Sequence, residues 1–449
     1  MKDDNFLKEH NARHLWHPMG HPGESQAHPP KIITDAAGVT ITDIDGHSTI
    51  DAVGGLWCVN LGYSNDAIKQ AISDQLARLP YYSAFAGTSN PAAIEASQMV
   101  CDLFAEDGMA RAFFTSGGSD SVDVALRLAR QYHRLRGEPT RTKFLSLKKG
   151  YHGTHFGGAS VNGNPRFRHG YEPLLPGCVH LPAPYTYRNP FHESDPARLA
   201  QLIAQAAEDE IAFQGADTIA ALIMEPILGA GGVIVPDESF MPLMREICDR
   251  HGILLISDEV ITGFGRSGDW SGARHWGVAP DMMTVAKGIT SGYFPVGAAL
   301  VSGAVAEVFE GADANGAIYT GYTYSAHPVG AAAVVATLTE TLRLDLRENA
   351  AARGRQLFEG CQRLAETHAI VGDVRGGHGL MTALELVSDR ATKAPADPAT
   401  VKRVHQAAYE AGAMVRMGPP NLMMSPPLTI SEAEIDTVLS ALDAGLSAA

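Results

Sequence analysis

Short apolar runs alternate with helical patterns through the middle of the chain. The runs span residues 112–114, 143–147, 219–224, 253–256, 282–286 and 296–301. Their mostly apolar character is typical of parallel strands that are buried on both faces. The alternation predicts an α/β fold, with one large domain over residues 62–328 and a mostly parallel, helix-covered sheet.

Helical periodicity is clearest after Ser119 and towards the end of the chain. After Ser119, apolar positions recur every three or four residues, at Val122, Ala125, Leu126 and Ala129. An Ala-rich helical stretch at 330–346 leads into strand-like residues 380–387 and a last amphipathic helix at 432–446. Residues 329–449 are therefore predicted to form a smaller α+β domain.

The N-terminal residues 1–61 differ from both regions. The first thirty are rich in His and Pro, a composition that resists regular structure, so we expect an irregular arm. This arm is expected to be solvated or to cover a dimer interface rather than to bind metal. Beyond it, β-like runs at 31–34 and 39–43 and the Asp45-Gly46 turn pair predict a small antiparallel unit. We expect this unit to pack with the small domain.

Composition and charge narrow the possible partners. Hydrophobic residues make up 45% and charged residues 19% of the chain, which excludes intrinsic disorder. The net charge of −15 disfavours nucleic acid and anionic membranes, so a small-molecule partner is expected. With no long apolar run or signal-like start, a cytoplasmic location is expected. The five cysteines are widely spaced and predict neither a disulfide framework nor a metal site.

Two charged residues follow buried strands at positions where α/β sheets bind ligands. Asp258 follows the run at 253–256, and Lys287 follows the run at 282–286. Asp258 alone could equally be a helix cap or a structural ion pair, and Lys287 could be a surface lysine. The apolar neighbours Val285, Ala286 and Ile289 favour a desolvated Lys287, and such a lysine can form a Schiff base.

Two further strand ends carry candidate ligand-binding groups. A Gly/Ser loop at 115–119 leads into a helix, whose free N–H groups suit a phosphate, although such turns are also common caps. Tyr151 follows another strand and offers a flat aromatic face. A phosphate cradle, an aromatic plate, a strand-end carboxylate and a buried lysine together indicate a pyridoxal 5'-phosphate (PLP) site.

With these residues in view, the chain resembles the class III aminotransferases of PLP fold type I. Among them it is similar to the ω-amino acid and ω-amine:pyruvate transaminases. The matching segments are 55–63, 150–153, 225–232, 257–266, 286–288 and 321–328, extended by 371–376 and Arg416. The resemblance covers nearly the whole chain.

The resemblance implies a role for each cofactor-binding residue. Lys287 would hold PLP covalently and then transfer the substrate proton, and Asp258 would pair with the pyridine nitrogen. Tyr151 and Val260 would sandwich the ring, and Gly118 and Ser119 would bind the phosphate. The remaining residues assigned to the cofactor are His152, Glu225 and Thr323. Thr323 would reach the phosphate of a neighbouring subunit, which implies a homodimer or a pair of such dimers.

The implied reaction moves an amino group from an ω-amino acid or primary amine to pyruvate or another 2-oxo acid by a ping-pong mechanism. The pocket lining implied by the resemblance is Trp57, Phe85, Tyr151, Ala230 and Arg416, where Arg416 would swing in to pair with a carboxylate. Arg416 could instead form a salt bridge at the rim. A taurine-specific or other donor-specific aminotransferase, an aminomutase on the same fold and a protein that only binds PLP remain alternatives.

The chain departs from the family pattern in two places. Where the family has Ser-Gly-Ser-Glu-Ala, this chain has Gly117, Gly118, Ser119, Asp120 and Ser121, so one hydroxyl of the expected phosphate site is lost. Near Thr323, many relatives have His-Gly-Phe-Thr where this chain has Thr-Gly-Tyr-Thr. The first difference concerns affinity for the phosphate rather than the chemistry.

Overall fold

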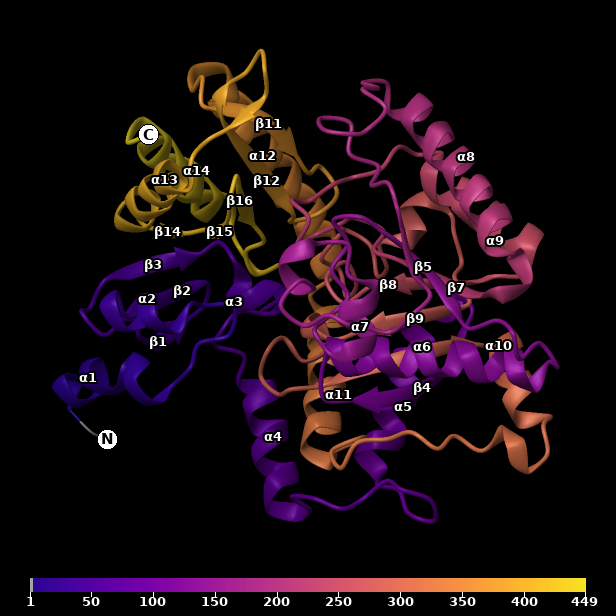
Figure 1. Cartoon of the computed structure of the whole chain (residues 1–449). Helices are drawn as coiled ribbons and strands as arrows, with labels where there is room; N and C mark the ends of the chain where they lie inside the picture. Colours follow the sequence, from indigo (N-terminus) through magenta and orange to yellow (C-terminus); the bar gives the residue numbers. More distant parts are fainter. Residues whose placement is uncertain (1–2) are drawn as a thin grey trace.

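A seven-stranded sheet forms the centre of the computed structural model, which describes residues 3–449 (Figure 1). Its strand order is β4-β10-β9-β8-β7-β5-β6. The strands are β4 (Met109–Thr115), β5 (Lys143–Leu147), β6 (Cys178–Leu181), β7 (Ile219–Met224), β8 (Leu254–Asp258), β9 (Met282–Val285) and β10 (Gly297–Ser302). Strands β5 to β9 pair in parallel, and β10 is antiparallel to both β4 and β9. The predicted α/β fold is confirmed.

Each apolar run found in the sequence overlaps a strand of this sheet. Strand β6 was not predicted, because it lies at the sheet edge and its residues before Leu181 are only half-buried. An edge strand needs apolar side chains on fewer sides, so its sequence carries a weaker pattern.

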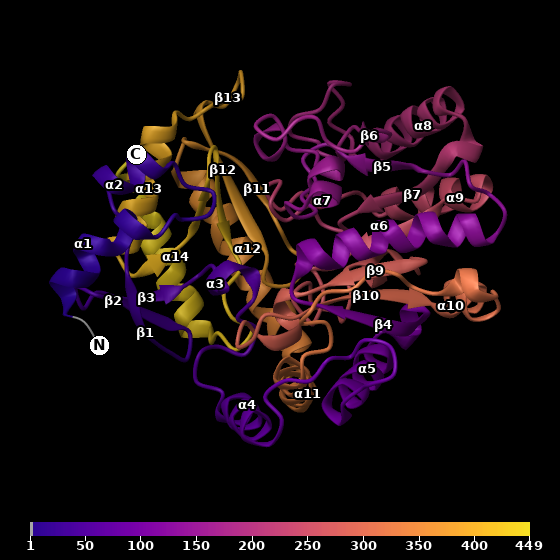
Figure 2. The same ribbon diagram turned by 60° about the horizontal axis from the view of Figure 1, so that its bottom comes forward.

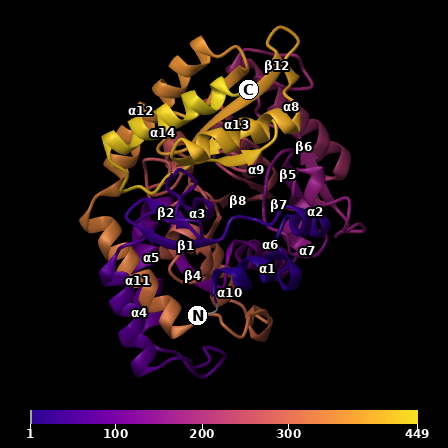
Figure 3. The same ribbon diagram turned by 90° about the vertical axis from the view of Figure 1, so that its left-hand side faces the viewer.

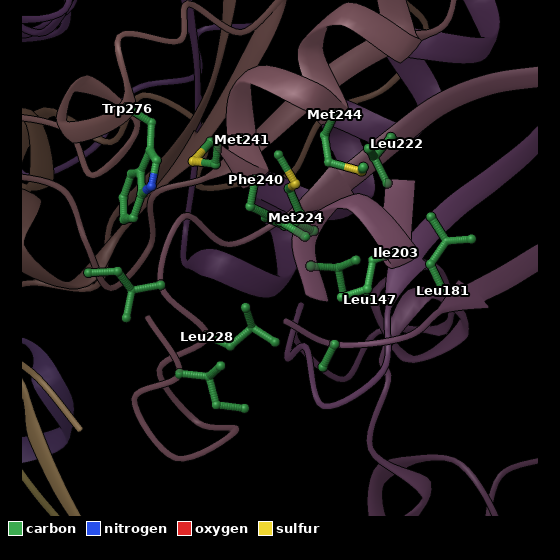
Figure 4. Packing of buried hydrophobic residues seen from close by; sticks show 14 of the residues in the cluster. Leu147, Leu181, Ile203, Leu222, Met224, Leu228, Phe240, Met241, Met244 and Trp276 are labelled. Atoms are coloured by element: carbon green, nitrogen blue, oxygen red, sulfur yellow. The ribbon is translucent and has the colours of Figure 1, made fainter. Parts of the chain in front are cut away.

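Alternate residues of the strands enter separate cores on the two faces of the sheet. In β7, Ala221 and Ile223 pack with helix α6 (Gly118–Leu135), whereas Leu222 and Met224 pack with α8 (Pro196–Gln214) and α9 (Phe240–His251). Figure 4 shows the second of these cores, where Leu222 and Met224 lie near Met244 and Phe240. This two-residue period buries β7 on both faces.

Further helices complete the cover of the sheet. Helices α5 (Pro91–Leu103) and α11 (Pro328–Arg343) pack together against β4, β9 and β10 (Figure 2). The remaining helices around the sheet are α4 (Asp66–Arg78), α7 (Phe156–Val161) and α10 (Gly303–Glu310). The helix expected at 330–346 ends at Arg343, and α12 (Leu346–Thr367) begins after Asp345, whose φ of +40° interrupts the helical path. Helix α12 was not predicted.

The C-terminal region forms a second sheet. Its strands are β11 (Val371–Arg375), β12 (Thr382–Asp389), β13 (Ala394–Pro395), β15 (Arg416–Gly418) and β16 (Asn421–Met424), in the order β11-β12-β16-β15 with β13 beside β12. Helix α12 packs against this sheet, together with α13 (Pro398–Glu410) and α14 (Glu432–Ser447). Figure 3 shows these three helices above the N-terminal strands.

A third sheet joins the two ends of the chain. Strands β1 (Ile33–Ala37), β2 (Thr40–Asp43) and β3 (Ser48–Asp51) are antiparallel, and β14 (Ala413–Met414) pairs with β3 in parallel. Helix α3 (Gly54–Trp57) follows β3. The Asp45-Gly46 turn joins β2 to β3. The division at residues 61 and 328 stays a prediction.

The expectation of an irregular N-terminal arm was wrong. Residues Asp4–His14 form helix α1, and Pro22–Ala27 form helix α2. The Asp3 side chain accepts a hydrogen bond from Phe6 N, and the His21 side chain accepts one from Glu24 N. Such caps, with a proline at the start of α2, favour a helix that composition alone does not indicate. Residues 1 and 2 of the expected arm lie outside the described residues.

Two more expectations concern the whole chain. No helix within residues 3–449 has both the length and the apolar character needed to cross a membrane. All five cysteines, which belong to the described part, are free thiols. The cytoplasmic location stays a prediction.

Candidate active site

A cavity of about 380 Å³ lies at the carboxyl ends of the central strands. Its walls come from the loops after β4, β5, β7, β8 and β9. Every expected cofactor-binding residue except Thr323 lines it: Gly118, Ser119, Tyr151, His152, Glu225, Asp258, Val260 and Lys287. Parallel strands end at one edge of a sheet, and this brings together residues that are far apart in sequence.

Lys287 enters the cavity from a strained position directly after β9. Its φ of +46° is in the left-handed region, which a lysine rarely adopts. Within residues 3–449, Nζ has no hydrogen-bond partner. Burial lowers the pKa of Lys287, and the negative charge of Asp258 partly offsets this effect. The unprotonated amine that a nucleophile requires is therefore more accessible than in an exposed lysine.

Asp258 ends β8 and is 3% exposed. Its Oδ2 lies 2.7 Å from Nδ1 of the buried His152, and its Oδ1 accepts a hydrogen bond from Val260 N at 3.2 Å. The other ring nitrogen of His152, Nε2, has no partner among the described residues. His152 thus both lines the cavity and orients Asp258.

Glu225 holds two segments of the cavity wall through backbone groups. Its Oε1 accepts a hydrogen bond from Tyr151 N at 2.8 Å, and its Oε2 accepts one from Gly229 N at 2.9 Å. Burial, together with the nearby Asp258, raises the pKa of Glu225 to about 7. In this structure, Glu225 positions Tyr151 and the turn at 228–234.

The Gly/Ser loop leads into the first turn of α6. Gly118 contacts Val260 so closely that a Cβ at this position would lie 3.0 Å from Val260 Cγ1. The first turn of a helix leaves backbone N–H groups unpaired, and these can bind an anion. Of the departures from the family pattern, Asp120 accepts a hydrogen bond from Ser116 N, and the buried Ser121 hydroxyl contacts Thr115 and β9. Neither side chain replaces the lost hydroxyl.

Of the five expected substrate residues, only Tyr151 lines the cavity, and Trp57, Phe85, Ala230 and Arg416 lie outside its wall. Trp57 is buried, and the guanidinium carbon of Arg416 lies 6.0 Å from the centre of its ring. Burial lowers the pKa of Arg416, and Tyr151 opposes this effect. Arg416 forms no ion pair with any carboxylate of the described chain, so the alternative of a rim salt bridge is not seen. Ala230 is half-buried in the turn at 228–234.

Phe85 and Thr323 lie on the outer surface of the single chain. Phe85 is 55% exposed, and Thr323 is exposed, with its carbonyl accepting a hydrogen bond from Tyr81 at 2.8 Å. Neither residue lines the cavity within the described chain. A single copy therefore does not bring them together with Lys287.

Several cavity residues were not found from the sequence. Cys58, Ile261, Thr290 and Phe294 line the cavity, and the ring of Phe167 lies edge-on to that of Tyr151, with centroids 5.0 Å apart. Cys58 falls inside a recognised segment, so its position carried a usable signal. Phe167 comes from a loop that packs on Tyr151 only in the folded chain. Among the described residues, no group of three or more His, Cys, Asp or Glu side chains is placed to hold a metal ion.

Comparison with known proteins agrees with this geometry. The family model for class-III aminotransferases matches residues 23–446. The chain is a class III aminotransferase. It is 37% identical over 417 residues to the putrescine–pyruvate aminotransferase of Pseudomonas aeruginosa, covering 91% of this chain and 89% of that protein.

Solved structures of related enzymes show the same fold. A PLP-bound amine transaminase from an uncultivated Pseudomonas species is 48% identical, with a TM-score of 0.95 over 97% of this chain and 98% of that one. An (S)-enantioselective ω-transaminase from Thermomicrobium roseum is 38% identical, with a TM-score of 0.96 over 100% of this chain and 99% of that one. The resemblance to PLP fold type I is thereby confirmed.

Class III aminotransferases depend on PLP, and the cavity fits this cofactor. The buried amine of Lys287, which has no hydrogen-bond partner within the described part of the chain, suits its aldehyde, and the buried carboxylate of Asp258 suits a protonated ring nitrogen. Tyr151 and Val260 both line the cavity and can contact an aromatic ring, and the start of α6 suits a phosphate. The donor set of this aminotransferase therefore matches each part of the cofactor.

Proposed function

We propose that this aminotransferase moves the amino group of a primary amine or ω-amino acid to pyruvate or another 2-oxo acid, in two half-reactions at one site. The observation that supports this choice is Arg416, a half-buried cation without a carboxylate partner in the described chain, beside the apolar Trp57. An arginine that can pair with a carboxylate, next to an apolar wall, suits both kinds of substrate. The names of the relatives support the same reaction.

The chain's own residues divide the work of this reaction. PLP supplies an aldehyde carbon and an electron-accepting ring when it is bound. Lys287 Nζ would take the proton from the substrate carbon that carries the amino group and would deliver it to the former aldehyde carbon of the cofactor. Asp258, oriented by His152, keeps a proton on the ring nitrogen, and Glu225 holds Tyr151 in place. The start of α6, with Gly118 and Ser119, binds the phosphate.

We infer that two chains assemble into a dimer with shared sites. The segments around Phe85 and Thr323 carry exposed aromatic residues, of which Tyr319 is 88% exposed. Tyr81 donates a hydrogen bond to Thr323 O and contacts the Tyr324 ring edge-on, so the two segments form one surface. A patch of this kind favours a protein interface. A partner chain would then bring Phe85 and Thr323 to a cavity, and pairing of such dimers stays open.

A panel of amine donors tests the proposed reaction. β-Alanine, taurine, a longer ω-amino acid and an arylalkylamine are each supplied with pyruvate, and alanine formation is measured with the absorbance change of the bound cofactor. We expect alanine from at least one donor that lacks an α-carboxylate. Rearranged product without any acceptor would instead indicate an aminomutase, and failure of every such donor would refute the proposed specificity.

A further inference from the structure

The side chain of Arg375, at the end of β11, joins segments that lie far apart in sequence. The residue is 9% exposed, and its guanidinium donates hydrogen bonds in three directions. It lies outside the cavity wall, and its polar contacts within residues 3–449 include no expected substrate residue. Its partners, however, belong to the two segments that carry Ala230 and Arg416.

The first branch runs to the turn at 228–234. Arg375 Nε donates to Gly232 O at 2.6 Å. The turn is closed by hydrogen bonds between Leu228 and Ile234, and Gly232 has a φ of +115°. A Cβ at Gly232 would lie 2.9 Å from Arg375 Nη2, and the positive φ itself favours glycine. The guanidinium thus holds Gly232 O, while Glu225 holds Gly229 N of the same turn.

The second branch runs to the hairpin of β15 and β16. Arg375 Nη2 donates to Asn421 Oδ1 at the start of β16. In this hairpin Gly418 pairs with Asn421, and Arg416 pairs with Met423. The bond to Asn421, together with the pairing of β16 with β12, therefore helps to fix where the backbone of Arg416 lies.

The third branch anchors the guanidinium in a charged network. Arg375 Nη1 donates to Asp373 Oδ2 at 2.6 Å, to the Tyr185 hydroxyl at 2.9 Å and to Glu385 Oε2 at 3.2 Å. The other oxygen of Glu385 accepts a hydrogen bond from Arg188 Nε at 2.6 Å. Because Glu385 and Tyr185 are buried, these charge-assisted bonds leave Arg375 little freedom to move.

We propose that Arg375 is a positioning residue that holds the turn at 228–234 and strand β15 at a fixed separation. It thereby places Arg416 for the carboxylate of an ω-amino acid or a 2-oxo acid. This inference rests on the proposed function, because it gives Arg416 the role of carboxylate partner. A planar guanidinium suits the task, since its donors point in fixed directions.

The variant Asn421→Ala tests the branch to the hairpin while Arg375 and its anchor remain. We expect KM for pyruvate and for an ω-amino acid to rise about tenfold, because a small displacement of a positioned group has a large effect. We expect kcat to stay within about twofold, and the single-turnover rate with an arylalkylamine to change as little. A loss of general stability alone would not separate the two substrate classes in this way.

The double variant Asn421→Ala with Arg416→Ala tests the route of the effect. If Asn421 acts through Arg416, its replacement changes KM no further once Arg416 is absent. The variant Arg188→Gln is the matched control, because Arg188 also bonds Glu385 but contacts neither Gly232 nor Asn421. We expect it to lower the melting temperature and to leave the KM values for pyruvate and for the ω-amino acid within about twofold of wild type.

The outcomes separate this inference from the proposed function. If Arg416→Ala weakens carboxylate substrates but Asn421→Ala does not, or if the two effects add, the positioning role is wrong and the proposed function stands. If Arg416→Ala has no effect on these substrates, the carboxylate role of Arg416 and the positioning role are both refuted. Arg375→Lys, which retains the charge and loses the planar donors, should reproduce the Asn421→Ala pattern.

Discussion

The cofactor side and the substrate side of the cavity differ in how their side chains are held. On the cofactor side, Asp258 and Lys287 follow buried parallel strands, and His152 and Glu225 fix their neighbours through short hydrogen bonds. On the substrate side, Arg416 sits on a three-residue strand, and Phe85 faces outward. One chain supplies all of the proposed cofactor side except Thr323, whereas the proposed substrate side depends on a hairpin, a turn and a partner.

This difference suits the two tasks. The cofactor has one shape, so its groups gain from a fixed arrangement within the central sheet. The substrates differ in size and charge, and the long side chain of Arg416 can adapt to them while Arg375 holds the strand that carries it. Substitutions on the cofactor side should therefore affect all substrates alike, and those on the substrate side should discriminate between them.

The largest effect is expected for Lys287→Ala. One amine both attaches the cofactor and transfers the proton, so we expect turnover with any donor to fall by about 10⁴-fold or more. Steady-state alanine formation measures this loss, and circular dichroism checks that the fold persists.

Lys149 is a matched control, because burial also lowers its pKa but it lies outside the cavity wall. Lys149→Met should retain most of the activity, and comparable activity in Lys287→Ala would disprove its role.

The next largest effect is expected for Asp258→Asn. An amide carries no charge to hold a proton on the ring nitrogen, so we expect kcat to fall roughly 10²- to 10³-fold for amine and amino acid donors alike. The cofactor content of the purified protein should be retained, as measured by absorbance. A loss of kcat confined to carboxylate substrates would show that Asp258 acts on the substrate. It would contradict the proposed difference between the two sides of the cavity.

Glu225 gives the cofactor side a dependence on pH. Its pKa is raised from 4.5 to about 7 on folding, so the folded chain binds the proton more tightly than the unfolded chain. The contribution of this group to stability is present below pH 4.5 and is lost as the pH rises to about 7, by up to about 3 kcal/mol. Denaturant unfolding of the cofactor-free protein at pH 5 and pH 8 measures the change. Glu225→Gln should reduce this difference, and an unchanged difference would refute the assignment.

The sequence predicted the cofactor side better than the substrate side for a physical reason. Asp258 and Lys287 follow apolar strands, and a buried strand leaves a readable pattern that also locates its end. Edge strand β6 and helices α1 and α2 were missed, because partial exposure and single capping bonds leave little trace in composition. The general fold could be predicted for the same reason as the positions of Asp258 and Lys287 at the strand ends.

Long-range contacts account for what the sequence could not predict. The hydrogen bond between Arg375 and Gly232 joins residues 143 positions apart, and no local sequence pattern predicts it. Likewise, Glu225 was assigned to the cofactor, but its hydrogen bonds to Tyr151 N and Gly229 N become visible only when the loops are folded together. The positions of Phe85 and Thr323 depend on a second chain as well.

On the substrate side, Arg416→Ala should separate the two substrate classes. A charge-assisted contact with a carboxylate contributes about 1.5–3 kcal/mol, so we expect pyruvate and ω-amino acids to bind roughly 10- to 100-fold more weakly. The arylalkylamine half-reaction needs no such contact and should stay within about twofold. Single-turnover rates with each substrate measure the split. An equal loss in both half-reactions would show that Arg416 is structural.

The smallest effect is expected for Thr323→Ala, which tests whether a partner chain contributes to the phosphate site. In a dimer with shared sites, Thr323 adds one hydrogen bond to a phosphate that the start of α6 already binds. We therefore expect the Kd for PLP to rise about tenfold, since a bond to a charged group contributes about 1.4 kcal/mol or more. Equilibrium titration of the cofactor-free dimer measures this shift, and Thr320→Ala on the same segment is the control.

Mixed dimers test whether the contact is made in trans. When Thr323→Ala chains are mixed with Lys287→Ala chains, the Thr323→Ala chain retains Lys287 and receives an intact Thr323 from its partner. Its site should then bind PLP with wild-type affinity, whereas a site that stays weakened in the mixed dimer would show that Thr323 acts within its own chain.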